Sequence, residues 1–537
     1  MKKTLTICLL FLGFLSMEAQ NFNKMTTQQK VEQYATVKLT TDLSFLSKSE
    51  REMVGIFIDI AEIMDDIYWK QVFGNKKEVY ELKDPWQQKF AEINYGFWDR
   101  MDDWKPFVKG AEVKTAGLNF YPKDMTKEEF EKLDDPMKNS QYSIIKRDKN
   151  GKLYVVGYYE AYKKDLDKAI ALMNKAISIC ENEEMKIYLK ERVKALQTND
   201  YFASDMAWMN MKNSNIDFVV GPIENYDDEL FGLKTSFESF VLIKDPVWSK
   251  SLEKYVKLLP KLQKSLPCEP IFKQEVPGTD SDLNVYDVVY YGGDCNAAGK
   301  TIAINLPNDE RVQLEKGARR LQLKNAMKAK FDAIVTPIAK QVLVADQVKY
   351  VNFDAFFSNV MFHEVSHGLG IKNTINGKGP VRKALQGEYS AYEEAKADIL
   401  GLWMVCELVK SGELQGVSEE QAIATYIAGL LRSIRFGATE AHGRANLLCY
   451  NFFEEHKAFS FEKDLYRIDF KQTRKAIDEW AAFIIKIEGT GDYDFAVKYG
   501  ETKAKINPTL QKNLDKINSA GIPVDVVFEQ GRKALGL

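Results

Sequence analysis

Apolar positions recur with helical spacing over residues 26–108 and 160–196, which predicts amphipathic helices in both stretches. Between them, turn residues at 148–151 separate two short apolar runs, and this pattern predicts a β-hairpin over 143–159. The N-terminal part of the chain should therefore be mainly helical with one hairpin.

Short β-type runs mark the middle of the chain, and helical periodicity returns from about residue 313 and continues almost to Gly521. The longest periodic stretches, 351–370 and 390–410, predict two long helices, and the last apolar run, 522–528, predicts a strand. The strands expected in the middle region are 216–220, 239–243, 285–291 and 301–306. This pattern is typical of a mainly helical α+β fold with a small sheet or barrel confined to one region.

Length and composition indicate a globular chain with two lobes. The 537 residues exceed what one hydrophobic core usually supports, and 45% of them are apolar. The 74 Lys and Arg residues nearly balance the 77 Asp and Glu residues, and no long block of one sign occurs. This balance gives no electrostatic support for non-specific binding to nucleic acid or to an anionic membrane.

The N-terminus predicts export from the cytoplasm. Lys2 and Lys3 precede an apolar run over residues 5–15, and small and polar residues follow, which is the order of a secretory signal peptide. We expect residues 1–19 to form this signal, with cleavage after Ala19; the alternative is a buried N-terminal helix. No later apolar run is long enough to span a membrane. The mature protein is therefore expected to be periplasmic or secreted, without an integral membrane segment.

The five cysteines beyond this signal predict neither a metal site nor a disulfide framework. They are widely separated and show no C-x-x-C spacing. They are Cys180, Cys268, Cys295, Cys406 and Cys449. We expect small buried apolar residues, with one bridge between Cys268 and Cys295 as the alternative.

Two of the four histidines lie in the five-residue pattern His363-Glu364-Val365-Ser366-His367. On a helix, positions i and i+4 share one face, so both imidazoles can reach a single metal ion. Glu364 lies one step around the helix, where its carboxylate can contact a water on that ion. Asp354 is placed to cap the N-terminus of this helix.

A catalytic zinc ion takes three protein ligands and keeps one position for water. The acidic helix over residues 392–398 offers the third ligand, for which we choose Glu394, while Glu393 or Asp398 can accept the second N–H of a ligating histidine. Spacing alone does not decide between Glu393 and Glu394, and a capping box from Ser390 to Glu393 is the structural alternative. The set predicts one zinc ion and hydrolysis by a metal-activated water, with Glu364 as the general base.

Four separated segments resemble motifs of the dipeptidyl peptidase III family of zinc exopeptidases. Residues 393–398 (E-E-A-K-A-D) are similar to the family's second metal motif, and residues 221–226 (G-P-I-E-N-Y) to its G-x-I-E-x-Y segment. Residues 305–308 (N-L-P-N) resemble an N-x-P-N segment, and residues 441–445 (A-H-G-R-A) an A-H-x-x-A helix. The resemblance covers less than half of the chain.

The resemblance implies a role for each matching residue around the metal. It supports Glu394 as the zinc ligand, with Glu393 and Asp398 holding the histidines. It also implies that Tyr226 donates to the oxyanion of the scissile carbonyl, and that His442 assists at the transition state. Both side chains are suitable donors to a developing negative charge.

The same resemblance implies how a short peptide substrate is held. Glu224 would bind the free amino terminus, and Asn305 and Asn308 the peptide backbone, which paired amides can satisfy as donors and acceptors. The expected activity is release of N-terminal dipeptides. The alternatives are a zinc aminopeptidase or endopeptidase of other specificity, or a peptide-binding protein without catalysis.

The family resemblance also implies two lobes separated by a wide cleft, one with the β core and the other helical and zinc-binding. After the signal, the expected segments alternate between the two lobes and end in a short C-terminal piece. They are 20–245 (β lobe with N-terminal helices), 246–283 (helical lobe), 284–330 (β lobe with Asn305 and Asn308), 331–510 (helical lobe) and 511–537 (C-terminal segment). One departure is the metal motif, which in the family usually reads H-E-x-x-G-H with an additional residue. This chain is therefore expected to represent a divergent branch.

Overall fold

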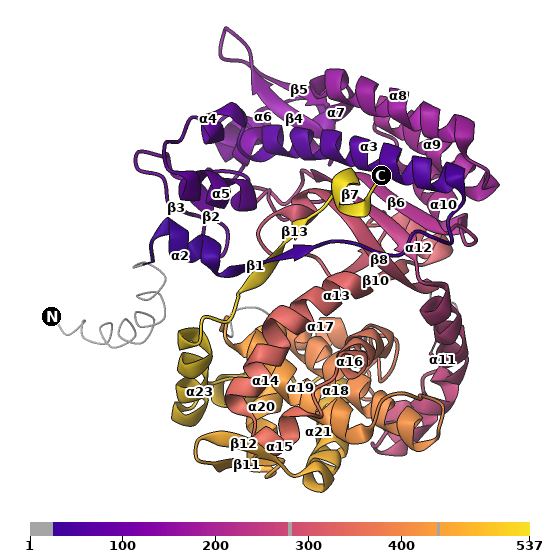
Figure 1. The fold of residues 1–537 in the computed structure, drawn as a ribbon, viewed down its shortest axis with the longest axis vertical. Helices are drawn as coiled ribbons and strands as arrows, with labels where there is room; N and C mark the ends of the chain where they lie inside the picture. The colour runs from indigo at the N-terminus through magenta and orange to yellow at the C-terminus, as the bar shows by residue number, and fades with distance from the viewer. Residues whose placement is uncertain (1–24, 278–281, 438–440) are drawn as a thin grey trace, which may run out of the picture. The chain divides into compact units, whose positions relative to one another are not determined.

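The computed structural model describes residues 25–277, 282–437 and 441–537 (Figure 1). The expected signal peptide, residues 1–19, lies outside the described residues. The chain divides into two compact units. Unit 1 consists of Met1–Leu242, Val289–Thr301 and Asp525–Leu537, and unit 2 of Ile243–Val288 and Ile302–Val524.

Unit 1 is built mainly from helices in the first part of the chain. The longest, α3 (Lys48–Val72), begins with a capping box between Ser47 and Glu50 and buries an apolar face. The other helices are α2 (Thr27–Glu32), α4 (Lys77–Tyr80), α5 (Pro85–Asn94), α6 (Lys127–Lys132), α7 (Tyr158–Ala161), α8 (Lys163–Ile179), α9 (Glu183–Thr198), α10 (Phe202–Asn210) and α24 (Arg532–Leu535). Short 3-10 turns are Leu118–Phe120, Pro136–Asn139 and Asp294–Asn296.

The strands of unit 1 include the predicted hairpin and a pair that joins the two ends of the chain. The hairpin consists of β4 (Ser143–Arg147) and β5 (Leu153–Gly157). Strand β1 (Tyr34–Lys38) pairs in parallel with β13 (Asp525–Glu529). The remaining strands of this unit are β2 (Trp98–Asp99), β3 (Lys105–Pro106), β6 (Ile216–Glu224) and β7 (Ser236–Lys244), whose last two residues belong to unit 2.

Unit 2 is mainly helical. Its helices are α11 (Pro246–Ser265), α12 (Glu310–Lys316), α13 (Lys324–Lys330), α14 (Thr336–Val342), α15 (Ala345–Val348), α16 (Phe353–Ser366), α17 (Val381–Leu385), α18 (Tyr389–Lys410), α19 (Glu419–Ile434), α20 (Ala441–Glu455), α21 (Phe470–Thr490), α22 (Tyr493–Lys503) and α23 (Pro508–Ser519). A π-helical turn, Phe331–Val335, joins α13 to α14, and 3-10 turns lie at Pro270–Lys273 and Gln386–Glu388.

The main sheet has the strand order β6-β7-β8-β10-β9. Strand β8 (Asp282–Gly293) crosses the boundary between the units, with its first part in unit 2. In unit 2, β10 (Arg319–Leu323) pairs in parallel with β8 and antiparallel with β9 (Ala303–Leu306). Because β9 ends the strand order, its outer edge has no strand partner among the described residues.

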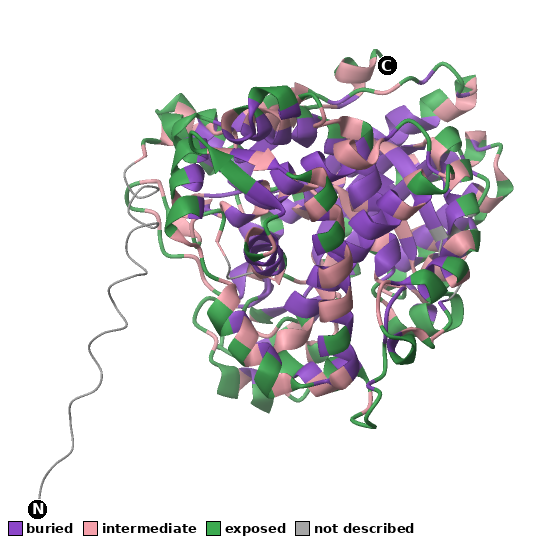
Figure 2. Cartoon of the chain, turned by 90° about the horizontal axis from the view of Figure 1, so that it is seen from below, coloured by how far each residue is buried: buried purple, intermediate pink, exposed green. Residues whose placement is uncertain are grey.

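Helix α16 packs against α18 in the core of unit 2, together with α19 and α20 (Figure 1). Figure 2 shows in purple the buried residues of the described chain, which include the middle of α16 and of α18. Gly401 on α18 permits this close approach. A Cβ atom at Gly401 would lie 2.7 Å from the backbone nitrogen of His363 and 2.9 Å from its Cα. The glycine therefore fixes how closely α18 approaches the middle of α16.

The α+β fold class is confirmed, as are the hairpin, the four middle strands, the two long helices and the last strand. Two expectations and one alternative, the capping box from Ser390 to Glu393, were wrong. Asn352, not Asp354, caps α16 through a bond from the Ala355 amide. No side-chain cap opens α18, so the capping box from Ser390 does not form. The helical region is interrupted by β10 and by the hairpin β11 (Phe459–Glu462) and β12 (Leu465–Ile468).

The division into units also differs from the expected segment boundaries. Residues 302–330, expected in the lobe with the N-terminal helices, belong to unit 2, where β10 pairs with β9 and α13 packs against α16. The C-terminal residues 525–537 belong to unit 1 because β13 pairs with β1. All five cysteines of the described part are free thiols, and Cys268 is the one that is not buried.

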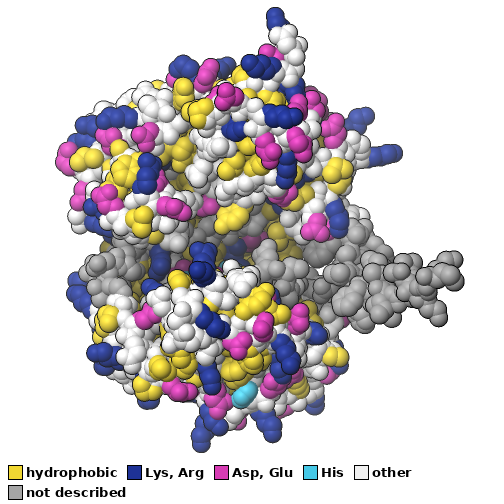
Figure 3. All heavy atoms as spheres, turned by 180° about the vertical axis from the view of Figure 1, so that it is seen from behind, with side chains coloured by type: hydrophobic (Ala, Val, Ile, Leu, Met, Phe, Trp, Pro, Cys, Tyr) yellow, Lys and Arg dark blue, Asp and Glu magenta, His cyan; other side chains and the backbone are white. Residues whose placement is uncertain are grey.

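The surface agrees with the balanced composition. Lys and Arg side chains are interspersed with Asp and Glu over the face shown in Figure 3, without a patch of one sign. Among the described residues, no helix is both long enough and apolar enough to cross a membrane.

Candidate metal centre

Helix α16 presents His363 and His367 on one face, one helical turn apart. Their ring centroids lie 4.9 Å apart with nearly perpendicular planes. His363 is buried and His367 half-buried. The helix ends at Ser366, so His367 lies at its C-terminal boundary, and the predicted pairing of the two rings on one helix face is present.

Glu394 approaches this pair from α18. Its Oε2 atom lies 3.3 Å from Nε2 of His363 and 3.9 Å from Nε2 of His367. One ligand atom from each of these three residues can be chosen so that all lie within 4.8 Å of one another. The structure therefore brings together the three side chains proposed as metal ligands.

Each of the two imidazoles is held from behind by a separate carboxylate of α18. Nδ1 of His363 lies 2.6 Å from Oδ1 of Asp398, and Nδ1 of His367 lies 2.9 Å from Oε1 of Glu393. A carboxylate accepts but does not donate, so each Nδ1 carries a proton, and Nε2 of the neutral ring is the atom that offers a lone pair to a metal. The spacing of this helix had left the roles of Glu393 and Glu394 open; in the structure Glu393 faces Nδ1 and Glu394 faces Nε2.

The charges of the site suit a cation. Burial raises the pKa of Glu394, but the imidazoles of His363 and His442 outweigh burial and hold it far below its usual value. Burial also raises the pKa of Glu393, but His367 and Lys396 outweigh burial and lower this pKa to about 2. Both carboxylates are therefore ionised at neutral pH.

Glu394 Oε2 also provides the test of whether a metal fits. This atom is buried and has no hydrogen-bond partner of good geometry among the described residues, although imidazole nitrogens surround it. Two imidazole Nε2 atoms and one carboxylate oxygen form the donor set that Zn²⁺ prefers at a catalytic site. The residues fit a divalent metal.

Two further predicted residues of unit 2, Glu364 and His442, border this cluster. Glu364 lies on α16 between the two candidate metal-binding histidines and is half-buried. His442, in the first turn of α20, places Nε2 3.1 Å from Oε2 of Glu394, and its side chain is 62% exposed. This contact with the carboxylate raises the pKa of His442 despite partial burial. Its ring is thus beside the metal ligands and open to solvent.

Asn305 and Asn308 belong to the same unit. Asn305 lies on the edge strand β9 and is exposed, and Asn308 follows that strand and is also exposed. Strand β10 connects this region to the metal centre, because Nη1 of Arg320 donates to the carbonyl oxygen of Glu364 at 3.1 Å.

Glu224 and Tyr226 lie in unit 1, where β6 ends and a loop begins. Tyr226 is 81% exposed. The charge of Glu224 is the main cause of a raised pKa of Tyr226, so the two side chains are close. Glu224 also contributes to the raised pKa values of the buried Glu238 and Asp294, for which burial is the main cause.

Residues that the sequence did not reveal support the cluster from outside. Lys396 is buried and lies 2.8 Å from Oε2 of Glu393 and 3.8 Å from Oε2 of Glu488 on α21. Asn446 donates from Nδ2 to Oδ2 of Asp398 at 3.0 Å and to the carbonyl of His442 at 2.8 Å. The i, i+3 spacing from Glu393 to Lys396 was the one available sequence signal.

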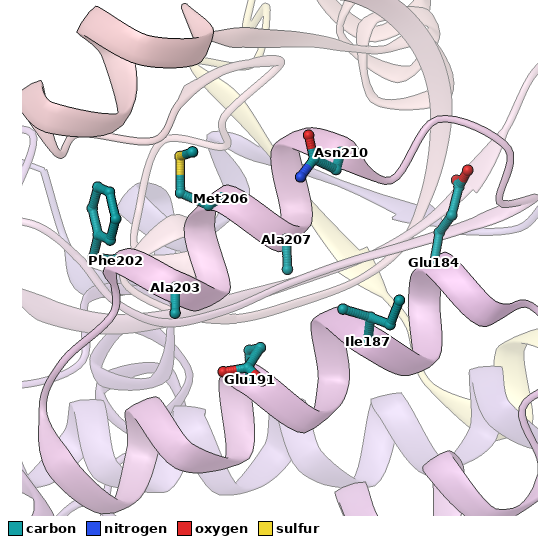
Figure 4. A pocket seen from close by; sticks show the side chains of 8 residues that line it. All are labelled: Glu184, Ile187, Glu191, Phe202, Ala203, Met206, Ala207 and Asn210. Carbon is teal, nitrogen blue, oxygen red and sulfur yellow. The ribbon is translucent and has the colours of Figure 1, made fainter.

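A hollow between α9 and α10 in unit 1 has a different character (Figure 4). Its lining is mostly apolar, with Glu184 and Glu191 at its edge. Glu184 accepts from the backbone of Lys212 and Asn213, and Glu191 accepts from Lys194. Because both carboxylates already have local partners, the hollow offers no catalytic pair.

Comparisons with known proteins match this chain to a peptidase family and to curated relatives. The model of peptidase family M49 matches residues 135–379. Nudix hydrolase 3 of Arabidopsis thaliana is 32% identical over 94% of this chain and 73% of its own length. Dipeptidyl peptidase 3 of Rattus norvegicus is 24% identical over 45% of this chain and 36% of its own.

Two solved structures are similar over nearly the whole chain. Dipeptidyl peptidase III from Caldithrix abyssi has a TM-score of 0.88 and 36% identity, and covers 93% of this chain and 98% of its own. The enzyme from Corallococcus sp. strain EGB has a TM-score of 0.76 and 32% identity, and covers 94% and 96%. The chain therefore belongs to peptidase family M49, the dipeptidyl peptidase III family, and is a metallopeptidase.

Proposed function

We propose that this metallopeptidase uses one zinc ion per chain to release dipeptides from the amino terminus of short peptides. The observation that carries the proposal is the orientation of the two imidazoles. Asp398 and Glu393 engage both Nδ1 atoms, so both Nε2 atoms face Oε2 of Glu394. The names of the dipeptidyl peptidases among the similar proteins support the same activity.

The chain supplies the groups that peptide hydrolysis requires. A bound zinc ion would lower the pKa of the attacking water to about 7 and polarise the scissile carbonyl. Glu364, beside the two ligands, takes a proton from this water and delivers it to the leaving amine. His442 stands beside Glu394 with its ring exposed, where it can donate to charge that develops on the carbonyl oxygen.

Substrate binding is assigned to groups in each unit. In unit 2, an extended peptide pairs with the outer edge of β9, which carries Asn305 and leads to Asn308. In unit 1, the Glu224 carboxylate is suited to the substrate ammonium, and Tyr226 to a carbonyl oxygen. Capture of the free amino terminus limits cleavage to a fixed distance from that end.

The test is product analysis with the zinc-loaded protein and an unblocked tetrapeptide, together with its N-acetyl form. We expect two dipeptides from the first and no cleavage of the second, with about one zinc ion per chain by metal analysis. Release of single residues would indicate an aminopeptidase. Hydrolysis of the acetylated peptide would indicate an endopeptidase, and binding without products a peptide-binding protein.

We also propose that the protein is exported, periplasmic or secreted, with residues 1–19 removed. The support is the order of the N-terminal sequence: two lysines, an apolar run, and small and polar residues. N-terminal sequencing of the protein from its native cells tests this. A first residue at Gln20 is expected, and an intact Met1 would refute it.

A further inference from the structure

Arg320 joins the strand pair that carries Asn305 to the helix that carries the metal-binding histidines. On β10 it stands directly opposite Asn305 of β9 in the antiparallel register. Its guanidinium donates to the carbonyl of Glu364 at 3.1 Å. One side chain thus contacts the backbone of the general base and lies next to a substrate-binding position.

The contact with Glu364 satisfies a group that the helix cannot. The last four carbonyls of a helix lack intrahelical donors, and α16 ends two residues after Glu364. The next two carbonyls, of Val365 and Ser366, accept from Gly368 and Leu369 at 3.0 Å each. Arg320 caps the third of these carbonyls, that of Glu364, and places a positive charge at the C-terminal end of the helix, where a cation is favourable.

The position of Arg320 beside Asn305 follows from strand geometry. Residues directly opposite one another in an antiparallel pair direct their side chains to the same face of the sheet. Asn305 and Arg320 therefore share a face, and that face is toward α16 because Arg320 reaches Glu364. A peptide held at Asn305 passes this guanidinium before it reaches the metal centre.

The guanidinium has donors left for such a peptide. Arginine carries five N–H groups, and within the described residues Glu364 is the one hydrogen-bond acceptor of Arg320. Arg320 is half-buried rather than enclosed. A carbonyl oxygen of a bound peptide would complete the pairing at little cost, because the first bond already fixes the side chain.

We propose that Arg320 is a substrate-positioning residue that donates to the carbonyl of the first, uncleaved peptide bond. This rests on the proposed function, in which the second peptide bond is cleaved. The backbone near the amino end is held at Asn305, and the second carbonyl lies at the metal, so the first carbonyl falls between them, beside Arg320. The same side chain keeps Glu364 in register with the substrate.

The experiment measures binding of an unblocked tetrapeptide to the zinc-loaded Glu364→Ala protein, which keeps the backbone carbonyl at position 364. Adding Arg320→Gln should weaken binding about 10- to 100-fold, as loss of a charge-assisted hydrogen bond does. Arg320→Lys should recover part of this loss. The control Arg382→Gln, at an exposed position on α17, should leave binding unchanged.

A modified substrate tests whether the oxygen of the first peptide carbonyl is the acceptor of Arg320. Replacing the first carbonyl oxygen by sulfur weakens it as an acceptor, so binding should fall in the Arg320 background and not with Arg320→Gln. Equal losses in both backgrounds, or binding by Arg320→Gln within twofold of its parent, overturns the proposal. Loss of zinc from both Arg320 variants also overturns it, because Arg320 would then be only a helix cap. Failure of the wild-type chain to bind or cleave any unblocked peptide refutes instead the proposed function.

Discussion

Oδ1 of Asp398 lies 2.6 Å from Nδ1 of His363, and this contact determines which nitrogen of the ring faces Glu394. The carboxylate comes from α18 and the imidazole from α16, two helices packed at Gly401. The ring orientation of His363 therefore depends on how closely α18 packs against α16, because α18 carries the carboxylate that holds Nδ1.

Asp398→Asn should weaken zinc binding by about 10- to 100-fold. The amide can present its NH₂ group to Nδ1, which favours the tautomer with the proton on Nε2, the atom needed for the metal. Competition with a chromogenic chelator measures the change in affinity. Asp494→Asn, at an exposed position on α22, is the control and should bind zinc as the wild type does. An unchanged affinity of Asp398→Asn would remove the carboxylate from the support of the metal.

Glu364→Ala should keep zinc and lose turnover. Glu364 is not among the three residues whose ligand atoms converge, so metal affinity should stay within a few-fold of the wild type. A general base typically contributes 10²- to 10⁴-fold in rate, so kcat should fall by roughly 10³-fold. Steady-state kinetics on an unblocked peptide and metal analysis check both parts, and a variant with undiminished kcat would exclude Glu364 from proton transfer.

Gly401→Ala should destabilise unit 2 by about 1–3 kcal/mol, because a Cβ there would meet the backbone of His363 and the helices would have to separate. Zinc affinity should fall as well, since α16 and α18 carry all the ligands. Gly429→Ala on α19 is the matched control: it has open space and should be neutral or slightly stabilising. Denaturant unfolding of both variants decides the matter, and equal stabilities would show that α16 does not need this glycine.

The sequence predicted the parts of the site that follow from local periodicity. The i, i+4 histidines and the acidic helix were found because a helix places such residues on one face. The supporting contacts were missed because they join distant positions: Arg320 meets Glu364 44 residues later, and Asn446 meets Asp398 48 residues earlier. No local pattern encodes such pairs.

The fold shows the same limit. The sequence predicts helix where β10 lies, because its five residues stand between helical stretches and alternate too briefly to reveal a period of two. Its neighbours β8 and β9 were found, but which strands pair, and that β9 lies at the edge, is decided by tertiary contacts. The Asp354 cap was wrong because Asn352, two residues earlier, supplies an equally suitable acceptor.

Asn446→Ala should reduce both zinc affinity and kcat. Its Nδ2 group donates to Asp398, which contacts His363, and to the carbonyl of His442, whose exposed ring lies beside Glu394. We expect about a tenfold loss of zinc affinity and a lower kcat. Because Asn446 acts on kcat through His442, the double variant Asn446→Ala/His442→Ala should lose less kcat than the sum of the two single losses.

Asn451→Ala is the matched control for Asn446, on the same helix. Its amide also donates to two backbone carbonyls, those of Lys503 and Lys505, but it does not contact Asp398. It should lower stability without a change in zinc affinity. If both asparagine variants lose stability alike and keep the same zinc affinity, Asn446 has no role beyond folding.

The buried Glu488, which lies behind Lys396 and Glu393, should make the free energy of unfolding depend on pH. The side chain is fully buried, neither carboxylate oxygen has a hydrogen-bond partner of good geometry among the described residues, and Lys396 lies 3.8 Å away. Burial raises the pKa of Glu488 well above its usual 4.5, although Lys396 opposes this. Between pH 4.5 and the raised value, the folded state binds more protons than the unfolded state.

Stability should therefore fall as pH rises through that window, by up to about 1.4 kcal/mol per pH unit. Glu488→Gln stays neutral at every pH and removes this slope, so the metal-free variant should gain stability over the wild type progressively above pH 4.5. Urea unfolding at a series of pH values measures the difference. Glu501→Gln, at an exposed position on α22, should show a constant difference. A difference independent of pH for Glu488→Gln as well would mean that Lys396 holds Glu488 ionised in the folded protein.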